Sequence, residues 1–348
     1  MSQPWTCADV GSFAWRTCTQ RWPTIVNDLT CDLPAFDAAL QQLCSEISVG
    51  TVVPLDDDNV EGARWSASHA FVDKPWTALP WYFGESFLYA KIRALVRYAD
   101  TAADPFLVTK QRQEGALPPM ADDDDLAAAM GRSLWGNRAD LSLPSALTFS
   151  GSADADLVAD DGPQARLMLA EANTVGILLD NAGVELAYDL SLTRLLLRRG
   201  KRVLLFCKDM PFFVSDATIA DVVRTQALLG WASAPGLEIV DDAFLTGPDF
   251  LTTAAMSAAL RVRLETCDVV IAKGDCNYRR LVGDIPPTTR PFAAVISFPA
   301  PVIALRTLKA EVLVGADAHR VAAAQIYDDW LVSGRFGLVQ VALSTLCR

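Results

Sequence analysis

Short apolar segments alternate with longer helical patterns through the second half of the chain, and this alternation constrains the fold more than any other feature. The apolar segments have the length of buried strands and lie at residues 176–179, 202–206, 237–240, 268–272 and 292–297, with a further short piece at 312–315. The helical patterns lie at residues 184–199, 216–229, 249–265 and 316–331. Buried strands joined by helices of about ten residues or more are typical of parallel βαβ units. We therefore predict an α/β fold, a Rossmann-like and mostly parallel sheet flanked by helices.

The first part of the chain is predicted to be helical. Residues 36–47 and 85–98 carry apolar side chains at the spacing of a single helix face, and the face of the second helix consists of Phe87, Ile92, Leu95 and Tyr98. We predict a helical N-terminal domain at residues 1–140 and the Rossmann-like α/β domain at residues 141–348.

Charge and histidine content exclude two classes of function. Lys and Arg number 30 against 42 Asp and Glu, which gives a net charge of -12. A chain this acidic has no basic field to hold a phosphate backbone, so we expect no nucleic-acid partner. The only histidines are His69 and His319, and a multi-histidine zinc or iron site is therefore excluded.

Nothing in the sequence indicates export or membrane insertion. The N-terminus lacks the basic start and apolar stretch of a signal peptide. The longest apolar run, residues 291–305, is interrupted by Pro299 and Pro301 and is shorter than the roughly 20 residues of a membrane helix. The eight cysteines form no C-x-x-C pair, and we expect reduced thiols. We expect a cytoplasmic protein without a membrane partner, and the sequence leaves the oligomeric state open.

Polar clusters follow four of the predicted strands, the last of them after a proline-rich turn. They lie at residues 180–185, 208–216, 273–280 and 306–309. In an open parallel sheet, ligands bind beyond the carboxyl ends of the strands. These clusters are therefore the candidates for a functional site.

The first two clusters offer oxygen ligands for a metal. Asp180, Asn181 and Asp216 supply hard oxygen donors without nitrogen or sulfur, a set that suits Mg²⁺ or Mn²⁺ better than zinc. A simpler interpretation stays open for each: Asp-Asn-Ala-Gly at residues 180–183 often forms a plain turn, and Asp216 or Ser215 could cap the following helix.

The other two clusters offer cations for an anion. Lys273, Arg279, Arg306 and Lys309, with backbone N–H groups around Gly274, could hold a phosphate. A metal opposed by cations around an anion is the arrangement that stabilises phosphoryl transfer. The alternatives are a plain strand exit at residues 273–274 and a solvated face at residues 306–309.

Signatures of other enzyme classes are absent from the sequence. It contains no G-x-x-x-x-G-K-[ST] nucleotide loop, no G-x-G-x-x-G after the first predicted strand and no G-x-S-x-G nucleophile elbow. The missing glycine-rich loop weakens a dinucleotide or adenosyl-cofactor interpretation.

The four clusters, in this order, resemble those of the damage-control phosphatases, a family long catalogued as domain of unknown function eighty-nine. Arg-Thr-Leu-Lys at residues 306–309 is similar to the Arg-Thr-x-Lys motif of the subfamily typified by acidic residue methyltransferase 1. Segments at residues 76–85, 104–106, 134–142 and 333–338 also look like that subfamily. Cys276 and Glu311 depart from it, since Leu and Asp are more usual there.

The resemblance implies a metal-dependent phosphatase for small sugar phosphates such as fructose 1-phosphate and fructose 6-phosphate, serving metabolite damage control. It implies Mn²⁺, Mg²⁺, Co²⁺ or Ni²⁺ bound by residues matching Asp180, Asn181 and Asp216, and it also implies a helical part over a Rossmann-like domain. The residues predicted to bind the substrate, on the resemblance and on the chemistry above, are Lys273, Asp275, Asn277, Tyr278, Arg279, Arg306, Lys309 and Glu85. Asp275 and Asn277 are predicted to orient the phosphate or the sugar hydroxyls. For Glu85, a structural role is an equal alternative.

Two questions of function stay open in the sequence. Asp180 could attack phosphorus itself, or the metal could activate water. The rival functions are an S-adenosylmethionine-dependent protein-glutamate O-methyltransferase and a non-catalytic sugar-phosphate-binding protein.

Overall fold

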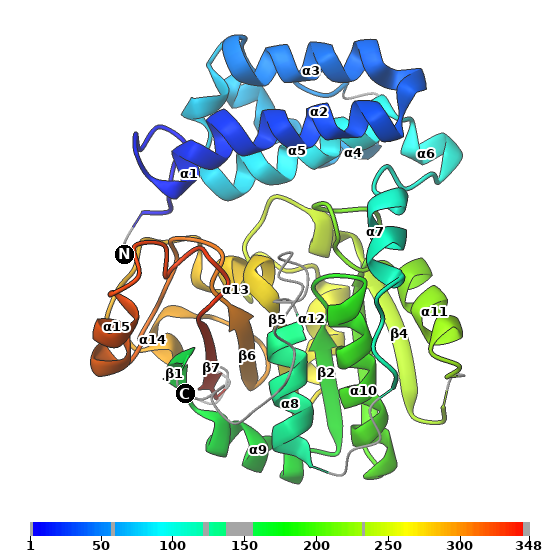
Figure 1. Cartoon of the computed structure of the whole chain (residues 1–348), viewed down its shortest axis with the longest axis vertical. Helices are drawn as coiled ribbons and strands as arrows, with labels where there is room; N and C mark the ends of the chain where they lie inside the picture. Colours follow the sequence, from blue (N-terminus) through cyan, green and yellow to red (C-terminus); the bar gives the residue numbers. More distant parts are fainter. Residues whose placement is uncertain (1–2, 57–59, 121–124, 137–155, 232–233, 344–348) are drawn as a thin grey trace.

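A layer of helices covers one end of the sheet in the computed structural model, which describes residues 3–56, 60–120, 125–136, 156–231 and 234–343 (Figure 1). In this layer α3 buries Leu40, Leu43 and Ile47, which confirms the first amphipathic pattern. The second helix is α5, which buries Phe87 and Ile92, but it is buried on almost every side and ends at Leu95, so the predicted amphipathic helix at residues 85–98 is wrong in its exposed face and in its end. The layer consists of α1 (Phe13–Arg16), the π-helical turn η1 (Thr17–Arg21), α2 (Trp22–Asp32), α3 (Asp37–Val49), α4 (Val60–Arg64), α5 (Trp81–Leu95) and α6 (Tyr98–Thr101), with short 3₁₀ turns at Pro34–Phe36, Ser66–Phe71 and Trp76–Ala78.

The sheet has seven strands in the order β1-β7-β6-β5-β2-β3-β4. Neighbouring strands run parallel except for β6 and β7, which are antiparallel. The predicted Rossmann-like, mostly parallel α/β architecture is therefore confirmed. The strands are β1 (Leu157–Asp160), β2 (Thr174–Leu178), β3 (Arg202–Lys208), β4 (Leu237–Asp242), β5 (Val269–Lys273), β6 (Val302–Thr307) and β7 (Gly337–Ala342).

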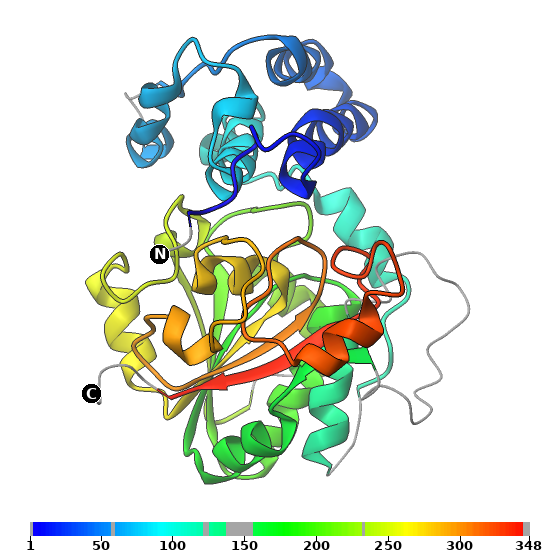
Figure 2. The ribbon, with the colours of Figure 1, turned by 90° about the vertical axis from the view of Figure 1, so that its left-hand side faces the viewer.

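Helices cover both faces of the sheet (Figure 2), and alternating side chains of the strands enter two apolar cores. On β5, for example, Val269 and Ile271 belong to one core, and Val270 and Ala272 belong to the other. The first core includes α8 (Leu126–Trp135), α9 (Gly162–Glu171), α10 (Val184–Arg198) and α11 (Ile219–Leu228). The second includes the helical layer with α12 (Ala258–Glu265), α13 (Gly274–Val282), α14 (Phe292–Val295) and α15 (Ala318–Ala324).

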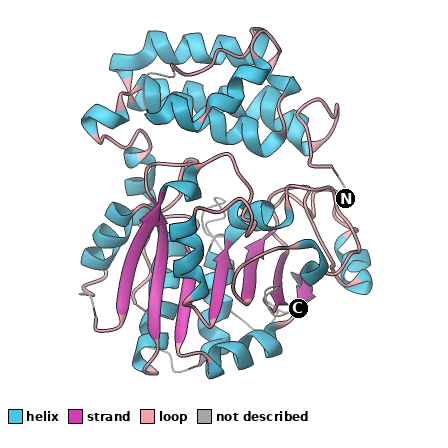
Figure 3. Cartoon of the chain, turned by 180° about the vertical axis from the view of Figure 1, so that it is seen from behind, coloured by secondary structure: helices cyan, strands magenta, loops and turns pink. Residues whose placement is uncertain are grey.

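The strand order creates a crevice between β2 and β5. From β2 the chain continues through β3 to β4 on one side, and then crosses to β5 and β6 on the other side. Ligands of open α/β sheets bind at such a reversal, beyond the carboxyl ends of the strands. Those ends point toward the helical layer (Figure 3), so the crevice opens beneath it.

Several sequence predictions of individual elements are wrong. Residues 292–297 do not form a strand, because Phe292–Val295 form the short helix α14 after Pro291, and the strand is β6 instead. The helix predicted at 249–265 begins only at Ala258, where Ser257 caps it. The last helix is α15, shorter than predicted. Strands β1 and β7 were not predicted, and residues 312–315 form no strand.

Two further findings concern the predicted domain boundary and the predicted absence of a membrane helix. α8 lies on the N-terminal side of the predicted domain boundary at residue 140, yet it packs against α10 and β6; the division itself stays a prediction. No helix within the described ranges is long and apolar enough to span a membrane.

Candidate active site

Asp180, Asn181 and Asp216 meet at the carboxyl ends of β2 and β3. Asn181 and Asp216 pair as an isolated antiparallel bridge. The backbone closes around this bridge, because the Ala217 N–H donates to the Asp180 carbonyl and the Ala182 N–H donates to the Ser215 carbonyl, both at 2.7 Å. The three predicted metal ligands therefore come from two loops that are hydrogen-bonded to each other.

Asp216 is not the cap of the helix that follows it. Thr218 occupies that position, and its side chain forms a capping box with Asp221. The carboxylate of Asp216 is thus left for the site. It is 1% exposed, and Asp180 is 3% exposed, so both carboxylates are almost completely removed from water.

Burial and crowding of these acids oppose their ionisation. Burial raises the pKa of Asp180 well above its ordinary value, and the charges of Glu185 and Asp216 raise it further. Burial also raises the pKa of Asp216, against the opposing charge of Lys208. Lys208 Nζ lies 3.1 Å from Asp216 Oδ2. A cation placed among these groups would relieve the repulsion.

The donor set fits a hard divalent cation. Asp180 Oδ1 is buried and has no hydrogen-bond partner, which is a position that a metal would satisfy. Asn181 donates its Nδ2–H to Asp180 Oδ2 at 3.0 Å and to Glu185 Oε2 at 2.9 Å. Its Oδ1 accepts from the Ser215 hydroxyl at 2.6 Å and keeps a second lone pair. No cluster of three His, Cys, Asp or Glu suited to a metal occurs in the described part of the chain, so Asn181 is needed to complete the set.

The start of α13 lies directly against Asp180. Gly274 has φ +74°, and a Cβ at this position would lie 1.9 Å from Asp180 Oδ2. Only glycine permits this approach. The next residue, Asp275, accepts from Arg306 Nε at 2.8 Å and from the Lys309 backbone N–H at 3.4 Å. Asp275 therefore joins α13 to the loop that carries Lys309.

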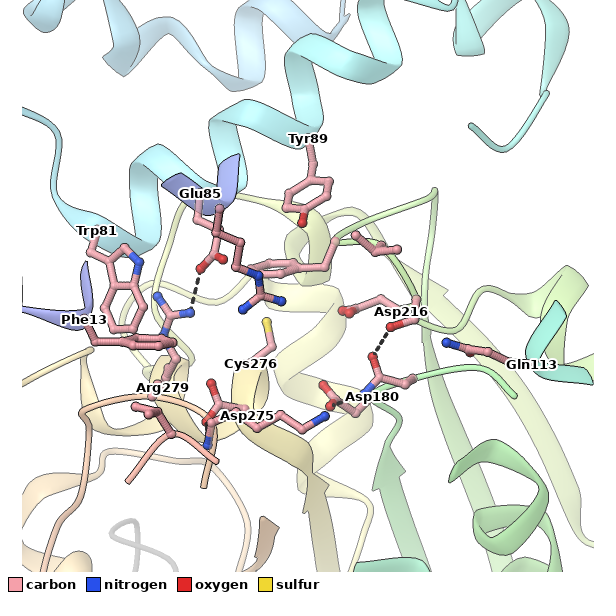
Figure 4. Close-up of a pocket in the computed structure, with 18 residues that line it drawn as sticks. Phe13, Trp81, Glu85, Tyr89, Gln113, Asp180, Asp216, Asp275, Cys276 and Arg279 are labelled. Carbon is pink, nitrogen blue, oxygen red and sulfur yellow. Dashed lines mark hydrogen bonds and ion pairs between the residues drawn. The ribbon is translucent and has the colours of Figure 1, made fainter. Parts of the chain in front are cut away.

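A cavity of about 400 Å³ contains this group of residues. In Figure 4, Trp81, Glu85 and Tyr89 reach into it from α5, while Asp180, Asp216 and Asp275 approach it from the sheet side. The cavity thus lies between the helical layer and the strand ends. It is lined by Phe13, Arg21, Trp81, Glu85, Tyr89, Gln113, Asp180, Asn181, Phe213, Val214, Ser215, Asp216, Asp275, Cys276, Arg279, Lys309, Ala310 and Val332.

Comparisons with known proteins identify the family. The model of the damage-control phosphatase ARMT1-like domain matches residues 17–324. The chain belongs to this family.

Individual relatives agree with this assignment. The chain is similar to damage-control phosphatase ARMT1 of Rattus norvegicus, with 26% identity over 95% of this chain and 96% of the relative, and to that of Homo sapiens, with 29% identity over the same shares. The match to the Danio rerio protein is 35% identical, over 60% of this chain and 56% of the relative. A DUF89 family protein from Pyrococcus horikoshii shares the fold, with a TM-score of 0.51 and 12% identity over 93% of this chain and 97% of that one.

Seven of the predicted site residues of this family member line the cavity. They are Glu85, Asp180, Asn181, Asp216, Asp275, Arg279 and Lys309. Arg279 is already engaged there, because it donates to Glu85 Oε2 at 2.6 Å and to Asp284 Oδ1 at 2.7 Å. Its guanidinium also stacks 3.7 Å from the centre of the Trp81 ring. Glu85 and Arg279 therefore join the helical layer to α13.

Lys273 and Asn277 lie beneath the cavity and not in its lining. Lys273 Nζ lies 3.0 Å from both Glu185 Oε1 and Asp189 Oδ1, and it donates to the Ser133 carbonyl at 2.6 Å. The amide of Asn277 donates to the Leu179 carbonyl at 3.1 Å. Both side chains hold the strand ends, and direct substrate contact by them stays a prediction.

Tyr278 and Arg306 are also outside the lining. The Tyr278 hydroxyl donates to Gln340 Oε1 at 2.9 Å on β7. Arg306 is fully buried and pairs with Asp275, with Arg306 Nη2 2.7 Å from Asp275 Oδ1. Arg306 thus acts on the site through Asp275, and contact with the substrate stays a prediction for both residues.

Sequence reasoning missed the residues that the first 120 positions bring to the cavity. Phe13 and Arg21 come from the first helices, Tyr89 from α5 and Gln113 from α7 (Leu107–Glu114). The one available signal is the helical period of α5, because Trp81, Glu85 and Tyr89 recur every fourth residue and therefore share a face. For the others, no local pattern indicates the cavity.

The two departures from the usual family pattern have different positions. Cys276 lines the cavity, and burial raises the pKa of its thiol well above the ordinary value, so it stays protonated. Glu311 lies two residues after Lys309 and accepts the Phe13 backbone N–H at 2.9 Å. No disulfide forms among the cysteines that the structure describes; Cys347 and residues 137–142 of a predicted family motif lie outside the described residues.

Proposed function

We propose that this chain is a metal-dependent phosphatase that hydrolyses small sugar phosphates, of the fructose 1-phosphate or fructose 6-phosphate type. One observation carries the proposal: two buried carboxylates and an amide oxygen converge at the sheet switch point, in the same cavity as Lys309. Family membership supports a phosphatase. The sugar-phosphate preference follows from the resemblance described above.

Asp180, Asn181 and Asp216 would hold the cation, which is Mn²⁺, Mg²⁺, Co²⁺ or Ni²⁺. Bound there, such an ion supplies positive charge to a phosphate oxygen. Lys208 pairs with Asp216 at 3.1 Å, and a cation held there would share the role of neutralising this carboxylate. The unpartnered oxygen of Asp180 supports this assignment.

Lys309 and the start of α13 are the groups suited to the remaining phosphate oxygens. Lys309 is a cation in the cavity lining. α13 begins at Gly274, beside Asp180, and the N-terminus of a helix favours anions. Asp275 fixes both elements, since it accepts from Lys309 N and Arg306 Nε. The phosphate would thus be bound by groups that follow three neighbouring strands: the metal ligands after β2, the start of α13 after β5, and Lys309 after β6.

The size and lining of the cavity suit a small polar metabolite. A cavity of about 400 Å³ lies in the size range of small-molecule sites and accommodates a hexose phosphate. Glu85 and Asp275 offer carboxylate acceptors for sugar hydroxyls, and Trp81 offers an aromatic face. Desolvation in this space strengthens each charge interaction with the phosphate.

The test is release of inorganic phosphate from a panel of sugar phosphates, with each of the four divalent ions and with chelator. We expect turnover only with metal, and Asp180→Ala should lower it by at least about a thousandfold. Asp328→Ala is the matched control, because Asp328 is exposed and outside the cavity lining. Wild-type protein that binds sugar phosphate without turnover at any ion would instead support the binding-protein alternative.

A further inference from the structure

Arg21 is a cation that the helical layer brings to the cavity. It lines the cavity and is exposed. Within the described part of the chain its guanidinium has neither an ion-pair nor a hydrogen-bond partner. Arg279, the other arginine in the lining, is by contrast neutralised by Glu85 and Asp284. The charge of Arg21 is therefore available to a ligand.

A π-helical turn sets the direction of Arg21. The turn Thr17–Arg21 joins α1 to α2, and the Trp22 N–H donates to the Thr17 carbonyl, five residues back. In an uninterrupted α-helix, residues seven apart share a face. A π-turn accommodates one extra residue, so Phe13 and Arg21, which are eight residues apart, both face the cavity. Such turns are frequent at functional sites.

The start of this helix is fixed to the loop that follows Lys309. Glu311 Oε2 accepts the Phe13 N–H at 2.9 Å, and the Glu311 carbonyl accepts from Trp5 Nε1 at 2.7 Å. Glu311 also pairs with Arg16 at 3.3 Å. The helix that carries Arg21 and the loop that carries Lys309 are therefore held in register on opposite sides of the cavity.

The surroundings of Arg21 favour an anion as its partner. Burial and then the charge of Glu85 raise the pKa of the neighbouring Tyr89 hydroxyl, although the charge of Arg21 opposes the rise. Because the rise prevails, the Tyr89 hydroxyl stays protonated and can donate a hydrogen bond. A guanidinium fork matches the oxygens of a phosphate in pairs. Three carboxylates of the cavity, those of Glu85, Asp216 and Asp275, are paired with Arg279, Lys208 and Arg306. Asp180 is assigned above to the proposed metal, so an incoming phosphate dianion is the partner left for the charge of Arg21.

We propose that Arg21 is a substrate-binding residue of the helical layer, and that it binds the phosphate group of the substrate from the side of the cavity facing Asp180 and Lys309. This inference rests on the proposed function, because it assumes a phosphate ester in this cavity. It assigns the helical layer a direct part in recognition. The phosphate is then enclosed by charges from both layers.

Titration calorimetry with inorganic phosphate in the presence of Mg²⁺ tests the inference without turnover. We expect Arg21→Gln to weaken phosphate binding by about tenfold or more, and Arg21→Lys to weaken it less, because the charge remains and the fork is lost. The control is Arg261→Gln, which removes the same charge from an arginine on α12 whose side chain is 44% exposed and pairs with Glu265; this variant should bind phosphate like the wild type.

Each other outcome has a defined meaning. Equal phosphate binding by Arg21→Gln and the wild type overturns the role of Arg21 and leaves the proposed function standing. The same holds if only the KM for a sugar phosphate rises, since Arg21 would then contact the sugar. A wild type that binds no phosphate overturns both proposals. Unchanged thermal unfolding of Arg21→Gln is expected, because the side chain is exposed and unpartnered, and it shows that the loss is one of binding.

Discussion

Replacement of Gly274 by alanine should displace the carboxylate on which the proposed metal site depends. A Cβ on Gly274 would lie 1.9 Å from Asp180 Oδ2 and 2.2 Å from its Cγ. Because Cβ contacts shorter than 3.0 Å essentially never occur, either the carboxylate or the start of α13 must move by about 1 Å. A misplacement of about 1 Å in a catalytic constellation costs on the order of a hundredfold in rate.

Gly274→Ala also introduces backbone strain, and a control variant is needed to distinguish the effect of this strain from the effect of the steric clash with Asp180. Gly274 has φ +74°, and an alanine in this region costs roughly 1–2 kcal/mol. Gly200 offers the matched control, since its φ is +78° and nothing lies within 4 Å of a Cβ at that position. Gly200→Ala should therefore lose about 1 kcal/mol of unfolding free energy and keep its activity.

The assay compares both variants by denaturant unfolding and by metal-dependent phosphate release. We expect Gly274→Ala to lose more stability than Gly200→Ala and to lose about a hundredfold in kcat/KM. If Gly274→Ala matches Gly200→Ala in both measurements, the close approach of α13 to Asp180 does not constrain the site, and the reasoning is refuted.

Three further predictions concern the buried charges around the site. Lys110→Met should lower the free energy of unfolding by about 1.5–3 kcal/mol in urea titration, because it removes the contacts of Lys110 Nζ with Asp104 and Asp221, both at 2.8 Å, while Arg224 still pairs with Asp221. Arg279→Lys should raise the denaturation rate and lower Tm, since lysine cannot bind both partners or stack on Trp81; an unchanged Tm contradicts this. Burial raises the pKa of Asp189 to about 6, so the native state binds this proton more tightly than the unfolded state, and stability should fall as pH rises from about 4 to about 6. Asp189→Asn should abolish that part of the pH dependence, measured by urea unfolding across this range.

The pH prediction follows from an imbalance of charge beneath the cavity. Lys273 is shared by two buried carboxylates, those of Glu185 and Asp189. The two acids raise the pKa of Lys273 above its ordinary value, so the lysine stays charged and one negative charge is in excess. Of the two acids, Asp189 is the one whose pKa rises, because it is buried and its Oδ2 has no hydrogen-bond partner in the described chain.

The rule that ligands bind beyond the carboxyl ends of parallel strands predicted which residues the sheet contributes to the site. Asp180 and Asn181 follow the end of β2 within three residues, Asp216 lies eight residues after the end of β3, and the apolar runs of both strands were recognisable from the sequence. A parallel sheet places such ends at one edge whatever the strand order. The three residues meet because β2 and β3, which are consecutive in the sequence, are also neighbours in the sheet. Their proximity could therefore be predicted even though strands β1 and β7 were missed.

The rule failed to separate residues that point into the cavity from residues that support it. Lys273 and Asp275 are two positions apart, yet Lys273 is completely buried beneath the site and Asp275 lines the cavity. The strand ends at Lys273, and α13 begins at Gly274 with a positive φ. The direction of each side chain depends on that sharp turn, which the sequence indicates only through one glycine.

The helical half of the cavity was beyond prediction for a different reason. Arg21 and Gln113 reach the site through packing between layers, and a contact of this kind leaves no periodic or spacing signal near either residue. Each lies on a helix whose apolar pattern reports only the face buried in the core. Polar residues on the remaining faces are equivalent in the sequence until the layers are docked. The ion pair between Glu85 and Arg279 and the hydrogen bond from Phe13 to Glu311 are among the contacts that hold the layers together, and such contacts between distant segments decide which polar residues of the helical layer become part of the site.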